Sequence, residues 1–279
     1  MRLQMLQVAR LATKPLGEAT ERVADFVHQQ LNADGGFKDR AGKSDLYYTV
    51  FGIDSLVALQ RELPTGAIAN YLTTFGDGDD LDTVHLTSLA RCWAAIDDDK
   101  QVRRLAPKVT QRLNADPRRS VYDCFLAVGA AQDVNAEPPV TADIAASLAP
   151  LAIGDGSYAN DADIQLGNTP ATAAAVTLQH QLGLPIDPQS SDWLLARCHE
   201  DGGFFAFSEA PIPDLLSTAV ALHALSAIRA DLSRVREPCL DFIDTLWTSR
   251  GSFFGNWAED TLDVEYTYYG LLALGHLSL

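Results

Sequence analysis

The chain alternates between two kinds of segment with helical character. The stretches PATAAAVTLQHQL (170–182) and DLLSTAVALHALSAI (214–228) carry no charge beyond the opening Asp214. Segments that are apolar most of the way round are expected to be buried on several sides. Between them, segments such as EATERVADFVHQQL (18–31) and QVRRLAPKVTQRL (101–113) place apolar residues at helical spacing with charged residues opposite. The alternation predicts pairs of helices, one buried and one amphipathic, repeated six times.

A short polar residue opens each buried segment. Asp45, Asp214 and Asp263 are each followed four residues later by a threonine, and three weaker matches complete the set. All are residue types whose side chains accept hydrogen bonds from the free N–H groups of a first helical turn. The predicted helix starts are Asp45, Asp79, Ser120, Asn168, Asp214 and Asp263.

Glycine-rich turns precede several of these starts. DGGF occurs at 34–37 and again at 201–204, with the variants GSY at 156–158 and GSF at 251–253. Glycine permits a positive φ at low cost. We therefore expect each turn to lead the chain from an amphipathic helix to a buried one, with its aromatic side chain plugging the end of the helix assembly.

The repeat restricts the architecture to two possibilities. Tandem helical pairs either extend as an open solenoid or close on themselves. An open solenoid needs a wet concave face, yet the buried helices here stay apolar from the first repeat to the last. No linker or break in composition divides the chain. The prediction is one all-α domain over residues 1–279, a closed (α/α)6 barrel of six helical hairpins.

Net charge and cysteine usage limit the possible binding partners and the cellular compartment of the protein. The net charge of −16 argues against binding to nucleic acid or to an anionic membrane surface. The four cysteines form no C-x-x-C pair, which favours reduced thiols in a cytoplasmic protein. The start of the chain lacks the apolar run of a signal peptide, and no stretch approaches the roughly 18 apolar residues typical of a membrane span.

Six hairpins with G-G-F turns and D-x-x-x-T helix starts resemble the α/α toroids, namely the protein prenyltransferase β subunits and the squalene–hopene cyclase family. The first repeat, GGFKDRAGKSDLYYT (35–49), is closer to the prenyltransferase type. The resemblance implies a central cavity, lined by aromatic residues, that holds an isoprenoid or another long apolar molecule. It also implies a possible protein partner, as the β subunits have.

The resemblance implies a zinc site that this sequence does not reproduce. The prenyltransferases hold zinc with the Asp and Cys of a D-x-C motif and a His from a neighbouring repeat. In one register Leu216 and Tyr266 occupy the Cys and His positions, and in the other Glu265 and Tyr48 do. We expect no zinc, while Asp263 with Glu265 leaves a hard metal such as Mg²⁺ as an alternative.

An acidic run suggests a different chemistry. The cyclases protonate an alkene with an acid of a D-x-D-D-T motif, and DGDDLDT (77–83) contains Asp79, Asp80 and Asp82. Clustered carboxylates raise one another's pKa, which a proton donor needs. The alternative is an acidic loop followed by a helix cap, where the helix dipole favours negative charge.

Aromatic residues near the starts of the buried helices are candidates for a ligand site. Such rings could cradle an apolar chain and stabilise cationic character, although ordinary core packing would use the same residues. We expect Tyr48 and Tyr266 to lie together at one end of the pocket, near Asp45, Asp263 and Glu265. The candidate substrate-binding residues are Tyr47, Tyr48, Phe51, His85, Trp93, Tyr122, Phe125, Tyr266 and Tyr268.

Three functional hypotheses remain open at this point. The first is a prenyltransferase-like protein that binds, and could act on, an isoprenoid, with catalytic groups among Asp79, Asp80, Asp82, Asp263 and Glu265. The second is a non-catalytic toroid that binds lipid or protein. The third is a cyclase-like acid catalyst that uses the Asp79–Asp82 cluster.

Overall fold

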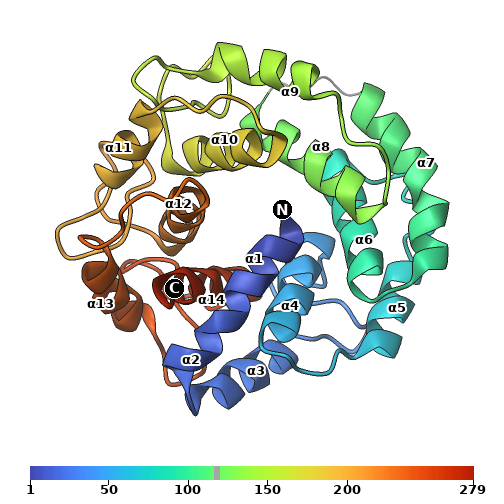
Figure 1. The fold of residues 1–279 in the computed structure, drawn as a ribbon. Helices are drawn as coiled ribbons and strands as arrows, with labels where there is room; N and C mark the ends of the chain where they lie inside the picture. Colours follow the sequence, from blue (N-terminus) through green and yellow to red (C-terminus); the bar gives the residue numbers. More distant parts are fainter. Residues whose placement is uncertain (116–119) are drawn as a thin grey trace.

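The computed structural model describes residues 1–115 and 120–279, which form two concentric rings of helices (Figure 1). The inner ring contains α4 (Leu46–Ala58), α6 (Thr83–Ala95), α8 (Val121–Asp133), α10 (Thr169–Leu182), α12 (Leu215–Ala227) and α14 (Val264–Leu277). The outer ring contains α3 (Ala19–Gln29), α5 (Thr65–Thr73), α7 (Asp99–Ala115), α9 (Thr141–Leu148) with the short η2 (Ala149–Leu151), α11 (Gln189–Leu195) and α13 (Arg236–Leu246). The chain begins with α1 (Arg2–Ala9), η1 (Arg10–Ala12) and α2 (Thr13–Leu16).

The inner ring is closed. Each inner helix packs on the next, and the last inner helix, α14, packs on the first, α4. Residues 1–115 and 120–279 contain isolated β-bridges in the turns and no strand. The predicted closed, all-α barrel is confirmed. No helix in the described part of the chain is both long and apolar enough to cross a membrane.

Polar N-caps start all six inner helices. Asp45, Asp214 and Asp263 accept from the backbone N–H three residues ahead, over 3.1, 2.7 and 2.8 Å, and Ser120 and Asn168 do the same for α8 and α10. These starts agree with the sequence prediction.

The prediction for the second inner helix was wrong. Its cap is Asp82, which accepts from the N–H of His85 over 2.8 Å, and not Asp79. Asp79 lies in the exposed loop before the helix and pairs with Lys108. This loop lacks the glycine–aromatic turn and carries several aspartates, so cap chemistry alone could not fix the start.

A repeat threonine joins inner helices α4, α10 and α12 to the turns before them. The N–H of Phe37 donates to Oγ1 of Thr49 over 3.0 Å, and the N–H of Phe204 donates to Oγ1 of Thr218 over 2.9 Å. The aromatic ring is then buried against the helix: a Cβ added to Gly52 would lie 2.3 Å from the ring of Phe37. The threonine therefore satisfies a buried N–H and holds the aromatic plug in place.

Glycine is required where the turns meet the outer ring. Gly35 has φ +95°, and a Cβ there would lie 1.9 Å from the carbonyl oxygen of Ala67 on α5. Gly251 has φ +88°, and a Cβ there would lie 2.1 Å from the carbonyl oxygen of Arg22 on α3. In both turns the glycine packs against a carbonyl oxygen of the next outer helix. Because the last turn makes this contact with the first outer helix, α3, the contact also closes the ring.

Helix α1 lies across one end of the barrel, where the inner helices finish (Figure 1). A Cβ on Gly275, near the end of α14, would lie 2.1 Å from the carbonyl oxygen of Val8. Arg2 pairs with Asp133 at the end of α8 over 3.5 Å and donates to the carbonyl oxygen of Arg91 on α6. One end of the barrel is thereby covered, while the N-terminal ends of the inner helices surround the other.

The substitution Thr218→Val tests the link between turn and helix. Valine keeps the shape but leaves the buried N–H of Phe204 without an acceptor, so we expect the free energy of unfolding to fall by about 1–3 kcal/mol. Urea unfolding followed by circular dichroism measures this. Thr110→Val, at a half-buried position on α7, is the matched control and should cost less. Equal losses in both variants would show that the hydrogen bond does not matter.

Candidate functional site

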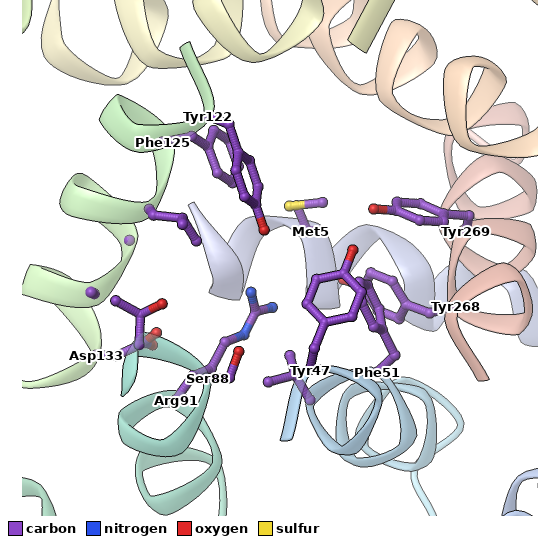
Figure 2. A pocket seen from close by; sticks show the side chains of 15 residues that line it. Met5, Tyr47, Phe51, Ser88, Arg91, Tyr122, Phe125, Asp133, Tyr268 and Tyr269 are labelled. Carbon is purple, nitrogen blue, oxygen red and sulfur yellow. The ribbon is translucent and has the colours of Figure 1, made fainter. Parts of the chain in front are cut away.

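Two adjoining cavities lie inside the inner ring, with volumes of about 120 Å³ and about 210 Å³. Their common wall is mostly aromatic and includes one side chain of the covering helix α1: Met5, Tyr47, Tyr122, Phe125 and Tyr269. The first cavity is also lined by Phe51, Tyr268, Thr87, Ser88, Arg91 and Asp133 (Figure 2). The second extends between α10 and α12, past Pro170, Ala174, Leu216, Val220 and His223.

The lining residues occupy equivalent positions in the repeats. Tyr47, Tyr122, Pro170 and Leu216 each follow the N-cap of their helix by two residues. Other lining residues follow the cap by five, six or nine residues. These positions lie on the same face of the helix as the position two residues after the cap. The six inner helices therefore present one shared face to the barrel axis.

Five of the nine residues expected to bind substrate line these cavities, namely Tyr47, Phe51, Tyr122, Phe125 and Tyr268. The structure places the other four, Tyr48, His85, Trp93 and Tyr266, outside both linings. Tyr48, His85 and Tyr266 follow their caps by three residues, which turns them by about 100° from the lining position. Trp93 is buried in the helix packing around the cavity. The cavity also uses Met5, Arg91, Asp133, His223 and Tyr269, which were not among the predicted site residues.

Tyr48 and Tyr266 lie outside the cavity linings, but the side chains of both interact with Arg40. Arg40, from the first glycine turn, reaches Asp263 over 2.9 Å and Glu259 over 3.0 Å. Its guanidinium lies 5.2 Å from the centroid of the Tyr266 ring. Burial raises the pKa of Asp263, although the N–H of Tyr266 and the charge of Arg40 work against this. Asp263 thus links the last repeat to the first.

Glu265 lies beside the cavity. It follows its N-cap by two residues, like the lining tyrosines, and accepts a hydrogen bond from the hydroxyl of Tyr47 over 2.7 Å. Burial raises the pKa of Glu265, against the effect of that hydrogen bond. Of the five candidate catalytic carboxylates, Glu265 is the one that contacts a cavity-lining side chain.

The acidic run at 77–82 forms no common site. Asp79 pairs with Lys108, Asp80 is exposed, and Asp82 accepts from both the N–H and the ring of His85. Burial works to raise the pKa of Asp82, but the hydrogen bonds from His85 outweigh it and the pKa is lowered. The other ring nitrogen of His85 lies 3.3 Å from Asp45, so this histidine bridges the caps of α4 and α6.

A charged network forms the polar wall of the first cavity. Arg91 and Asp133 line this wall (Figure 2); Arg91 is ion-paired with buried Asp54, and Asp133 with Arg2. Burial alone would lower the pKa of Arg91, but the carboxylates of Asp54 and Asp133 raise it above its usual value. Asp54 and Arg91 are the only charged residues within α4 and α6. A lone charge in an otherwise apolar helix is the sequence signal that could have revealed them.

A model of the prenyltransferase alpha-alpha toroid domain matches residues 4–110 and 171–278, more than half of the chain. The chain belongs to the prenyltransferase alpha-alpha toroid family. No curated protein matches it.

The zinc positions of the toroid family can now be placed. Leu216 lines the second cavity, Glu265 bonds to Tyr47, and Tyr266 lies under Arg40. Within residues 1–115 and 120–279, no group of three or more His, Cys, Asp and Glu side chains is arranged to hold a metal. The absence of bound zinc stays a prediction, which elemental analysis can test.

The toroid also buries a pair of histidines at the second cavity. Nδ1 of His223, on α12, lies 3.0 Å from Nε2 of His276, on α14. Burial lowers the pKa of His223 to about 4 and that of His276 to about 3, and the N-terminal amine and His180 add to the effect on His223. Both rings are therefore neutral at pH 7 and share one proton in the hydrogen bond between them.

The histidine pair should make folding sensitive to mild acid. As the pH falls below 6.5, the unfolded chain takes up protons that the folded toroid excludes until about pH 4, so this contribution to stability is lost on acidification. Between pH 7.5 and 5.5 the two histidines should together remove about 2–3 kcal/mol from the free energy of unfolding.

The control for this prediction removes both titrating rings. The double variant His223→Gln/His276→Gln should lose less stability than the wild type over the same interval, whereas His28→Gln, on the exposed face of α3, should behave as the wild type does. Urea unfolding at the two pH values measures the difference. Parallel pH dependence in wild type and double variant would contradict the prediction.

Proposed function

We propose that this toroid binds an isoprenoid or another long apolar molecule in its central cavity. The observation that carries the proposal is the lining: Tyr47, Phe51, Tyr122, Phe125, Tyr268 and Tyr269 face two adjoining spaces inside the barrel. Ligand sites are typically concave and mostly apolar, with a few convergent polar groups. This cavity has that composition.

The size of the cavity is compatible with such a ligand. The two spaces adjoin at Tyr47, Tyr122 and Tyr269, and together they reach the lower end of the roughly 300–1,000 Å³ found for small-molecule sites. Met5 contributes an unbranched side chain, which adapts readily to different shapes. Tyr122 keeps 39% of its surface accessible although the barrel surrounds it, because it faces the cavity rather than a packed neighbour.

The arrangement of acids favours binding as the core of the proposal. A cyclase-like acid would need a carboxyl facing the ligand, and Asp79, Asp80 and Asp82 do not line either space. Glu265 lies near enough to act through Tyr47, but among the described residues it belongs to no group of three or more His, Cys, Asp and Glu side chains that could hold a metal. Ligand binding without catalysis is therefore the proposed role, because it requires neither a carboxyl facing the ligand nor a metal site.

Filling the cavity tests the proposal. Ala174 lines the second space, so Ala174→Phe should lower the affinity for Nile red, a neutral apolar dye, at least about tenfold, because it removes volume the dye would occupy. Fluorescence titration measures the affinity. Ala146→Phe, at an exposed position on α9, is the control and should bind as the wild type does. Unchanged binding by a folded Ala174→Phe variant would exclude the cavity as the site.

Elemental analysis tests the expected absence of zinc. Because Leu216, Glu265, Tyr48 and Tyr266 stand where thiolate and imidazole ligands are expected, the purified toroid should carry no stoichiometric zinc, and a chelator should leave its melting temperature unchanged. About one zinc per chain that is lost in Asp263→Ala would contradict this.

A further inference from the structure

We infer that the ligand carries an uncharged polar end, a hydroxyl or a similar group, held between the hydroxyls of Tyr122 and Tyr269, and that an isoprenoid diphosphate is disfavoured. This inference rests on the proposed function, since it concerns the same cavity. It is argued from the polar groups that face the ligand space and from the charges around them.

Four tyrosines line the cavities, and two of them can offer a hydroxyl to both cavities. Tyr122 on α8 and Tyr269 on α14 line both cavities from opposite walls, and their hydroxyls point into the space between them (Figure 2). Tyr47 already donates to Glu265, and Tyr268, which lines the first cavity alone, has a buried hydroxyl without a partner among the described residues. Neither Tyr122 nor Tyr269 has a side-chain hydrogen bond within the described residues, so each can donate to and accept from a ligand hydroxyl.

These tyrosines remain neutral. Burial raises the pKa of Tyr122 to about 12 and that of Tyr269 well above its usual value, and the nearby Glu265 adds to both. Phenols in this state offer hydrogen bonds but no compensating positive charge. They suit a neutral partner better than an anionic one.

The charged groups of the cavity do not leave a cation free. Arg91 lines the first cavity, but it is paired with Asp54 and also lies in the field of Asp133. Asp133 is in turn paired with Arg2, and Glu265 adds a further carboxylate beside Tyr47. The N-terminal amine adds a third cation, which lies in the field of Asp133, so with every group ionised three cations face three carboxylates. A phosphate brought into this buried network would have to displace an existing partner of Arg91.

The mouth of the barrel is rich in carboxylates. Asp45 and Asp82 flank His85, while Glu259 and Asp263 flank Arg40. Arg40 is held by two carboxylates, two more carboxylates raise the pKa of His85, and the whole chain carries a net charge of −16. An approaching diphosphate would therefore meet a repulsive field.

The test compares three ligands that share one hydrocarbon chain: farnesol, farnesyl diphosphate and the hydrocarbon farnesene. Each displaces Nile red from the purified full-length chain at pH 7.5, with the diphosphate measured both with and without Mg²⁺. We expect farnesol to bind at least about tenfold more tightly than the diphosphate under both conditions. Equal or tighter binding of the diphosphate, with or without Mg²⁺, would overturn the inference.

Variants locate the polar contact. The double variant Tyr122→Phe/Tyr269→Phe keeps both rings and should reduce the preference for farnesol over farnesene about tenfold, with farnesene affinity unchanged. Tyr266→Phe, outside both linings, should keep the wild-type preference. An unchanged preference in the double variant would overturn the inference alone. If farnesol, farnesene and Nile red all fail to bind the folded wild type, the proposed function fails, and this inference fails with it.

Discussion

The hydrogen bond between a turn N–H and the buried repeat threonine is the contact on which the rest of this toroid depends. In the first, fourth and fifth hairpins it joins the aromatic residue of the turn (Phe37, Tyr158 or Phe204) to the first turn of the next inner helix. In the last hairpin, hydroxyls of Ser252 and Thr267 meet instead, over 2.7 Å. Because the N-cap lies four residues before the threonine, cap and turn are fixed together. In these four hairpins the turn is thus tied to the inner helix that follows it.

Equivalent positions after the six N-caps form one shared inward face. When every inner helix starts at the same height with the same rotation, residues at the same distance from the cap meet around the axis. Tyr47, Tyr122 and Glu265 come from three different repeats yet gather at one level of the barrel. The ligand space is therefore a property of the ring as a whole. The covering helix α1 completes it by placing Met5 against both cavities.

The ring leaves charge where an apolar barrel would be expected to have none. Asp54, Arg91, Asp133 and Arg2 are held in pairs at the end covered by α1, and Arg40 joins Asp263 at the other. Buried pairs of this kind cost desolvation and contribute little net stability. These pairs make both ends of the barrel polar and charged, while the middle of the barrel is lined by aromatic residues. The neutral, hydrogen-bonded pair of His223 and His276 adds a third polar point in the same wall.

The sequence by itself determined the alternation of helices, five of the six inner caps, the glycine–aromatic turns and closure of the barrel, because these depend on local rules: cap chemistry, positive φ at glycine, and the absence of charge on a helix buried on every side. It also pointed to the aromatic group from which most of the lining is drawn. Only the tertiary structure decided that Tyr47 rather than Tyr48 faces the axis. Neighbouring residues on a helix differ by about 100° in direction, and packing against both neighbouring helices sets the rotation. The cap at Asp82 rather than Asp79, the pairing of Arg91 with Asp54, and the contact between His223 and His276 likewise join residues far apart in the chain or choose between equivalent neighbours, which no local pattern specifies.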